Sequence, residues 1–232
     1  GKTIPYAGAG FKIYDPDGNP VTMTFTYPTP TTIDVFYTNA EGSLVTPEKL
    51  PFGKGYSIVE VQAPYGYVLD ETPVYFDVTE DNSTEESGVT VVKVDKPNMA
   101  QKGTIAVEKT GEVFFGVSVI GGVDESGNEL PAIYQTQYEK RGLPGAVYEI
   151  IAAEDIITPD GTVRNQNGEV VDTVTTDENG TAVSRELYLG KYEVREITAP
   201  HGMVLNPEPH FVELIYAGQN VAVTETATSF EN

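Results

Sequence analysis

The sequence predicts an all-β protein made of two tandem β-sandwich domains, on three observations. Helical periodicity is almost absent, while short runs rich in Val, Ile, Thr, Tyr and Phe alternate between apolar and polar residues. Turn-forming residues separate these runs, as in residues 15–19, DPDGN, and residues 177–180, DENG. One block of sequence also occurs twice, and an internal repeat fixes the number of domains more firmly than length does.

The repeat sets the order of the expected strands. Residues 7–13, AGAGFKI, open the first copy and reappear as residues 144–150, PGAVYEI. Residues 56–69, YSIVEVQAPYGYVL, follow in the first copy and reappear as residues 192–205, YEVREITAPHGMVL. In each block an alternating run precedes a turn that contains Pro and Gly, so each copy is expected to place a strand and a turn at the same point of its sandwich.

The polar stretch at residues 95–103 lies between the copies and interrupts the strand pattern. We therefore expect a first domain over residues 1–100 and a second over residues 101–232. The first copy begins so near position 1 that its first strand is missing. The second copy carries an additional segment, residues 111–142, which we expect to form a hairpin or a long surface loop.

Charge and composition exclude several classes of function. The 232 residues include 35 Asp and Glu against 14 Lys and Arg, a formal charge of −21, which repels phosphate backbones and anionic lipid. There is no cysteine, so disulfides, thiolate metal sites and cysteine nucleophiles are excluded. No apolar run is long enough to cross a bilayer and no signal-peptide pattern opens the chain, so an exported protein would be represented here by an internal fragment.

Three polar residues stand where an apolar face would continue. Lys109, Glu196 and Asn232 each come two positions after an apolar residue of a predicted strand, and residues two apart share a face. A charged group in a core is costly unless it is paired. Periodicity alone therefore favours the ordinary interpretation, in which each strand ends there and the polar group reaches solvent or forms a salt bridge.

Four motifs occur in a fixed order in the second copy: residues 103–110, GTIAVEKT, residues 143–150, LPGAVYEI, residues 192–200, YEVREITAP, and residues 230–232, FEN. With these motifs, both copies resemble the collagen-adhesin B-type (CnaB, or SpaA-like) domains of Gram-positive surface adhesins and pilins. The resemblance covers nearly the whole chain. It implies two prealbumin-like or immunoglobulin-like sandwich domains from the stalk of a surface adhesin or pilus subunit.

The resemblance also implies a covalent bond. In this family a Lys of the first strand and an Asn or Asp of the last form an intramolecular isopeptide bond, promoted by a Glu, which corresponds to Lys109, Asn232 and Glu196. The residue types suit that chemistry, because burial favours a neutral, nucleophilic amine and a protonated carboxyl that can polarise a carboxamide and transfer protons to departing ammonia. The reaction would occur once per molecule, so the protein is not expected to be an enzyme.

The first copy departs from the pattern. Glu60 corresponds to Glu196, but Lys2 lies in the approach to the next strand and is a poor substitute for the missing lysine. Two acceptors are open: Asp95, at the end of a strand expected over residues 89–94, and Asn98, which has the better spacing. We expect no internal cross-link in this copy and an idle Glu60. Its open sheet edge could receive a strand from a neighbouring chain.

Two other binding functions compete. The acidic segments at residues 15–19 and 81–86 are rich in oxygen ligands for calcium, but they lack the pattern of an EF-hand, and turn formation explains them better. Tyr65 and Tyr67 look exposed enough to stack on sugars, although the absence of Trp weakens that reading.

An enzyme is disfavoured because the two histidines, His201 and His210, have no spaced Ser and Asp partners; both are expected on loop or strand surfaces. The resemblance therefore implies a wall-anchored, extracellular stalk, and we expect no metal and no cofactor. Its partners would be the rest of the adhesin or pilus chain and, through other domains, a host matrix protein or glycan, without nucleic acid or membrane insertion. The alternative is an extracellular carbohydrate- or protein-binding module without a cross-link.

Overall fold

The computed structural model describes residues 7–80, 84–86 and 89–232. These residues form strands, turns and bends without a helix, which confirms the predicted all-β class, and the described part holds no helix that could cross a membrane. The chain divides into two compact units. Unit 1 takes the chain up to Gln101 together with Ile157–Thr162 and Tyr216–Ala222, and unit 2 consists of Lys102–Ile156, Val163–Ile215 and Val223–Asn232.

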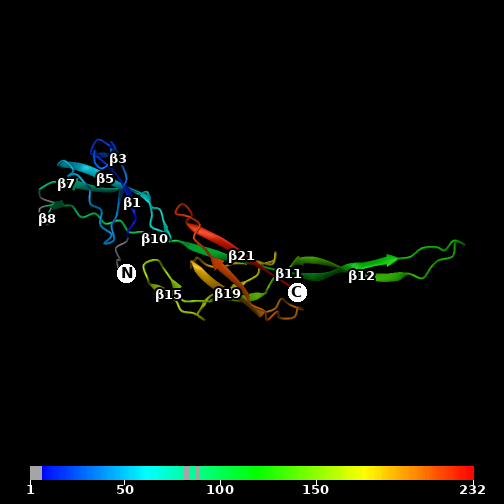
Figure 1. Cartoon of the computed structure of the whole chain (residues 1–232). Coiled ribbons are helices and arrows are strands. Elements are labelled where there is room, and N and C mark those ends of the chain that lie inside the picture. Colours follow the sequence, from blue (N-terminus) through cyan, green and yellow to red (C-terminus); the bar gives the residue numbers. More distant parts are fainter. Residues whose placement is uncertain (1–6, 81–83, 87–88) are drawn as a thin grey trace. The chain divides into compact units, whose positions relative to one another are not determined.

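Unit 1 is built on an antiparallel sheet with the strand order β4-β1-β5-β7 (Figure 1). The strands before residue 101 are β1 (Gly10–Tyr14), β2 (Met23–Phe25), β3 (Thr31–Ile33), β4 (Phe36–Tyr37), β5 (Gly53–Gln62), β6 (Tyr67–Val68), β7 (Val74–Val78), β8 (Thr84–Glu86), β9 (Val89–Val91) and β10 (Met99–Ala100). The apolar core on this sheet contains Ile13, Met23, Phe36, Tyr56 and Val78.

The strand expected over residues 89–94 is shorter than predicted. It ends at Val91 because β9 pairs with β8, which offers only three residues, Thr84–Glu86. Asp95 therefore lies in irregular chain and is exposed. Tyr67 also differs from expectation, because its ring is buried in unit 1, whereas Tyr65 is 76% exposed.

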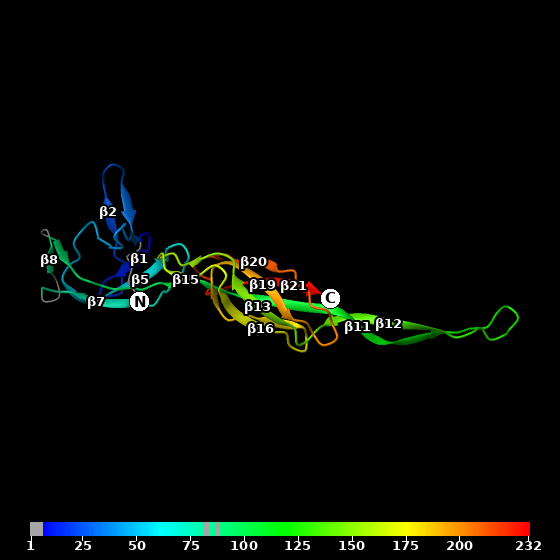
Figure 2. The same ribbon diagram turned by 90° about the horizontal axis from the view of Figure 1, so that it is seen from below.

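Unit 2 is a sandwich of two sheets. The strands after residue 101 are β11 (Lys102–Ile120), β12 (Ile133–Gly142), β13 (Val147–Ala152), β14 (Ile156–Ile157), β15 (Val163–Asn165), β16 (Val170–Thr175), β17 (Thr181–Val183), β18 (Leu187–Tyr188), β19 (Gly190–Thr198), β20 (His210–Leu214) and β21 (Val223–Glu231). One sheet has the order β16-β13-β19-β20, and the other gathers β12, β17, β18 and β21 around β11 (Figure 2).

Alternation along the strands creates the core between these sheets. In β13, β19 and the first half of β11, residues at alternate positions point inward, because side chains of a strand alternate between its two faces. The inward residues pack as one cluster that includes Ile105, Val107, Tyr148, Ile150, Tyr192, Val194 and Phe230. The cluster fixes the register of these strands, since a slip of one residue would turn each apolar face to solvent.

β11 takes part first in the sandwich and then in a hairpin with β12. From Lys102 to Thr110 it pairs with β21 in parallel, so the first and last strands of unit 2 lie side by side. From Thr110 to Ile120 it pairs with β12 in an antiparallel ladder. Residues 111–142 therefore form a hairpin that continues a sandwich strand beyond the sandwich of unit 2.

Candidate functional site

Lys109 is buried on the inward face of β11. It follows Ile105 and Val107 at alternate positions, and its side chain has no exposed surface. Its backbone N–H donates to the carbonyl of Gly180 at 2.7 Å, and its carbonyl accepts from the N–H of Leu143 at 2.8 Å. The lysine is thus held inside the sandwich by the same alternation and hydrogen bonding that hold the apolar residues before it.

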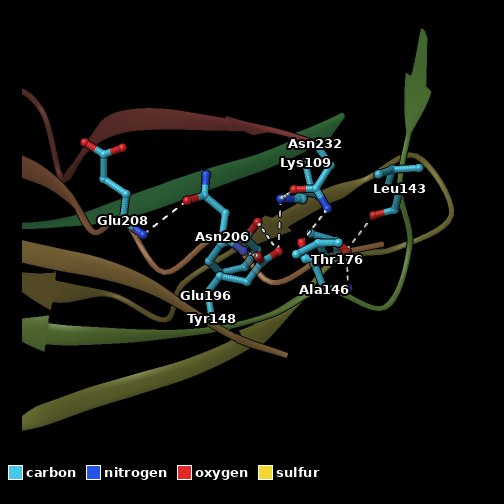
Figure 3. Close-up of polar contacts among 10 residues, drawn as sticks. Lys109, Leu143, Ala146, Tyr148, Thr176, Glu196, Asn206, Glu208 and Asn232 are labelled. Carbon is cyan, nitrogen blue, oxygen red and sulfur yellow. Dashed lines mark hydrogen bonds and ion pairs between the residues drawn. The ribbon is translucent and has the colours of Figure 1, made fainter. Parts of the chain in front are cut away.

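Glu196 meets Lys109 from the opposite sheet. It lies on β19, its side chain is likewise fully buried, and its Oε1 lies 3.0 Å from Lys109 Nζ (Figure 3). Tyr148 stands directly opposite Glu196 in the register of β13 and β19, and its hydroxyl donates to Oε1 at 3.3 Å. The backbone N–H of Asn206 donates to the other carboxylate oxygen at 2.7 Å. Both oxygens of the carboxylate are therefore fixed.

Asn232 completes the group from the end of β21. The parallel pairing places Phe230 opposite Lys109, so the chain two residues later reaches the amine. Lys109 Nζ donates to Asn232 Oδ1 at 2.7 Å, and Asn232 Nδ2 donates to the carbonyl of Val204 at 3.1 Å (Figure 3). Asn232 as a whole residue is exposed, unlike Lys109 and Glu196. An open depression lined by residues 202–207 lies beside it.

A group of packed aromatic rings lies beside the buried amine. Phe230 packs on Tyr148 with ring centroids 4.8 Å apart and stacks on His210 at 3.9 Å. Lys109 Nζ lies 6.0 Å from the centroid of the Phe230 ring. Burial, and then the charge of Glu196, raise the pKa of the Tyr148 hydroxyl, so this group stays protonated and remains a hydrogen-bond donor.

Hydrogen bonds of Thr176 stabilise the chain segment that follows the hairpin and borders the site. The hydroxyl of Thr176 donates to the carbonyl of Leu143 at 2.8 Å and accepts from the N–H of Ala146 at 3.0 Å. These bonds fix the turn that follows the hairpin. The N–H of Leu143 in this turn donates to the carbonyl of Lys109. Sequence reasoning missed Tyr148, Thr176 and Asn206. Tyr148 could have been found, because it lies in the repeated motif at residues 144–150.

Unit 1 holds a related but incomplete arrangement. Glu60 is fully buried, and it accepts from the N–H of Asp70 at 3.1 Å as Glu196 does from Asn206. Asn98 Nδ2 donates to both oxygens of Glu60, at 2.7 and 2.9 Å. Of the two candidate acceptors, Asn98 is thus the one at Glu60.

Lys96, the described lysine beside the unit 1 site, binds other groups. Lys96 pairs with Asp70 at 2.8 Å and donates to the carbonyl of Thr72, and within the described residues no lysine forms an ion pair with Glu60. Lys2 falls outside the described residues. The structure therefore places an amide nitrogen at Glu60, whereas a lysine amine occupies the corresponding place at Glu196.

The acidic segment at residues 15–19 is used for a turn. The Asp15 carboxylate accepts from the N–H groups of Asp17 and Asn19, and these hydrogen bonds lower its pKa. No cluster of metal-ligating side chains is present in the portion of the chain that is described. Part of the other acidic segment, residues 81–83, lies outside that portion.

His210 was expected on a loop or strand surface. It is half-buried instead, and its ring stacks on Phe230.

Comparison with known proteins agrees with this fold. Residues 2–93 and 133–228 match the family described as SpaA, prealbumin-like fold domain. A 67-residue stretch, 29% of this chain and 12% of the relative, is 31% identical to the trypsin-resistant surface T6 protein of Streptococcus pyogenes serotype M6.

Among solved structures, the TIE protein of Bacillus anthracis covers 99% of this chain with a TM-score of 0.52 and 24% identity, and the chain covers 32% of it. A minor pilin of Streptococcus agalactiae aligns over 100% of this chain and 84% of its own, with 17% identity and a TM-score of 0.32. The matched stretch therefore covers 12% of the length of the T6 protein, and the chain covers about a third of the TIE protein structure.

Proposed function

The chain belongs to the SpaA family of prealbumin-like fold domains, and from this we propose that it is a structural stalk segment of an extracellular adhesin or pilus subunit of a Gram-positive bacterium. We propose further that a self-formed amide bond between Lys109 and Asn232, promoted by Glu196, closes its second domain. The T6 relative, named as a surface protein, is consistent with this location. Anchorage in the cell wall and assembly with the rest of the pilus or adhesin chain belong to the same proposal.

The position of Lys109 Nζ carries the proposal. It lies 3.0 Å from Glu196 Oε1 and 2.7 Å from Asn232 Oδ1, with the lysine and glutamate side chains fully buried. A salt bridge alone would need only the carboxylate, and burying two charges costs several kcal/mol per ion before they attract each other. The carboxamide at the same nitrogen gives the amine an electrophile held in place by the fold.

The proposed reaction exchanges one bond for another. Lys109 Nζ attacks Cγ of Asn232, the Nζ–Cγ amide bond forms, and the Cγ–Nδ2 bond breaks. Glu196 accepts a proton from the amine and returns it to the departing nitrogen, which leaves as ammonia. The carbonyl of Val204 holds Nδ2 at 3.1 Å, and the open depression at residues 202–207 offers ammonia a route to solvent. Each molecule reacts once, so no turnover is involved.

The bond would bear load because of where it lies. β11 and β21 are parallel neighbours and carry Lys109 and Asn232 at corresponding ends. Tension that enters at Lys102 would pass along β11, cross to Asn232 and leave unit 2, while the 123-residue loop between the two residues stayed folded. Closing a loop of that length stabilises the domain by roughly 4–5 kcal/mol in a chain-entropy model.

Intact mass under denaturing conditions tests the proposal. The wild-type chain should be lighter than its sequence by one ammonia, and Lys109→Ala should have its full mass. Lys109→Arg keeps a cation beside Glu196 but cannot form the bond. It should therefore also have its full mass, and it replaces the alanine variant if that variant misfolds. Lys102→Ala, on the same strand, should keep the deficit. A wild-type chain of full mass would leave a binding module without a cross-link as the better account.

A further inference from the structure

The hairpin at residues 111–142, called the ribbon below, joins the sandwich of unit 2 at its base, where Lys140 pairs with Glu231 at 2.9 Å. Beyond Thr110, β11 pairs with β12 alone among the described strands, and Figure 2 shows both strands running out from the sandwich of unit 2. A two-stranded ribbon is marginally stable in water unless one of its faces is covered. The ribbon nevertheless keeps a regular ladder from Thr110 opposite Gly142 to Ile120 opposite Ile133.

One face of the ribbon is apolar along its length, whereas the other is polar in its middle and apolar at the end of the ladder near the tip. Register and alternation place on one face the cross-strand pairs Phe114–Tyr138, Val117–Thr136 and Val119–Tyr134, here called the apolar face. The large side chains of the apolar face range from 51% exposed at Val117 to 71% at Tyr134. The opposite face carries Ser118, Gln135 and Gln137 at the same level, and the exposed pair Ile120–Ile133 follows them toward the tip. The ribbon thus has the pattern of a strand pair that buries one face.

A β-bulge makes the apolar face continuous. The register shifts between Phe114 and Gly116, so Phe115 is an extra residue without a partner on β12. Without it, Phe114 would lie on the face opposite Val117 and Val119, because successive residues alternate. The bulge therefore brings the Phe114–Tyr138 pair, whose rings meet edge to face at 6.1 Å, into line with the other apolar side chains.

The charge pattern identifies the partner. Residues 113–120 and 133–138 carry no charged side chain, in a chain whose net charge is −21. Two copies of so acidic a chain repel each other over most of their surface, and the repulsion is weakest where charges are absent. The base of the ribbon carries the cations Lys140 and Arg141 beside Glu112 and Glu139, and Lys140 pairs with Glu231 of β21. The tip, residues 121–132, carries Asp124, Glu125 and Glu129 and no Lys or Arg.

We propose that the ribbon is a self-association surface, on which the apolar face packs against the apolar face of a second copy with the two ribbons antiparallel. A two-fold axis through the middle of the ribbon makes such a contact self-complementary. The antiparallel arrangement places each acidic tip over the base of the partner ribbon, which carries both cations of the hairpin, whereas a parallel one would bring the two acidic tips together. The ribbon lies outside the Lys109 site, so this inference stands or falls independently of the cross-link.

Sedimentation equilibrium of the whole chain over a range of concentrations tests the proposal. We expect a monomer–dimer equilibrium that strengthens with salt, because salt screens the repulsion and favours apolar burial. Tyr134→Glu with Thr136→Glu places two charges on the apolar face and should weaken dimerisation at least about tenfold. Gln135→Glu with Gln137→Glu adds the same charge to the polar face of the same strand and should change it much less.

Three results would overturn the proposal. The first is a wild-type chain that stays monomeric at every concentration and salt level, and the second is equal weakening by the two double variants. The third concerns orientation. The chain has no cysteine, so Ser126→Cys near the tip introduces a single thiol. In antiparallel ribbons the two tips lie apart, and efficient formation of a disulfide-linked dimer by Ser126→Cys would contradict that arrangement.

Discussion

Tyr148 stands directly opposite Glu196 in the register of β13 and β19, and its hydroxyl donates to the carboxylate oxygen that also faces Lys109. In unit 1 the residue opposite Glu60 in the corresponding register is Phe11, which has no hydroxyl. The hydroxyl is thus a feature of the site that contains the lysine. It holds Glu196 Oε1 in the position from which a proton can be exchanged with the amine.

Tyr148→Phe should slow formation of the Lys109–Asn232 bond without preventing it. Loss of one hydrogen bond to a charged group costs about 1.5–3 kcal/mol, which corresponds to a rate lower by about tenfold or more. The fraction of chain lacking ammonia, followed by intact mass after refolding, measures this rate. Tyr192→Phe removes another buried hydroxyl, bonded to the carbonyl of Tyr188, and should leave the rate unchanged. Equal slowing in both variants would show a general effect of folding.

Glu196→Gln should abolish the bond and destabilise unit 2. The amide cannot accept the proton of Lys109, and the lysine is left buried without its counter-charge, a defect that typically costs 3–5 kcal/mol. Intact mass reports the bond, and denaturant unfolding reports the stability. Glu60→Gln makes the same change at the related position of unit 1 and should leave the ammonia deficit in place. A normal deficit in Glu196→Gln would remove this residue from the reaction.

The wild-type chain should lose one ammonia and not two. Glu60 in unit 1 faces the amide nitrogen of Asn98, and within the described residues no lysine pairs with it. Asn232→Ala should therefore restore the full mass, while Asn98→Ala and Asp95→Ala keep the deficit of one. Loss of two molecules of ammonia, with one regained in Lys2→Ala, would instead show a second bond in the first domain.

Gly180→Ala should destabilise the turn beneath Lys109. Gly180 has a φ of +78°, and an added Cβ would lie 2.4 Å from the carbonyl oxygen of Lys109. Gly145 has a similar φ, +81°, but nothing lies within 4 Å of its added Cβ. Gly145→Ala is therefore expected to cost about 1–2 kcal/mol for the left-handed backbone alone, and Gly180→Ala more. Thermal melting compares the two variants. Equal losses of melting temperature would mean that small shifts of the chain relieve the contact between the added Cβ and the carbonyl oxygen of Lys109.

Stability of unit 2 should fall in acid partly through Asp177. Its carboxylate accepts hydrogen bonds from the N–H groups of Asn179 and Thr181, which lower its pKa below the usual value. A lowered pKa means that this contribution is present above the unfolded value, about 3.9, and disappears as the pH falls through the folded one. Asp177→Asn should therefore flatten the fall in melting temperature below pH 4. An unchanged acid slope would contradict this.

Much of this architecture could be predicted from alternation and from the repeat. Alternation shows that Lys109, Glu196 and Asn232 each continue an apolar face, and the family resemblance assigns them to one site. The structure brings them together. Alternation assigns a side chain to a face, but it does not measure exposure at a strand end. Asn232 therefore lies at the exposed rim, beside the buried Lys109 and Glu196.

Other features depend on contacts that no local pattern encodes. Tyr67 is buried although Tyr65, two positions before it, is exposed, because β6 pairs with β10, a strand far away in the sequence. The choice of Asn98 over Asp95 likewise depends on where the chain after β9 lies against Glu60. The bulge at Phe115 was invisible to alternation, since it is the residue that breaks the alternation.

β11 runs without interruption from Lys102 to Ile120, with Lys109 near the point where it leaves the sandwich. The ribbon consequently begins two residues after Lys109, the residue that would carry the covalent bond. A sideways pull on the ribbon would reach the Lys109–Asn232 linkage through a continuous backbone, without first peeling strands from the sheet. The same strand would then connect the proposed contact between two copies to the proposed covalent bond within each copy.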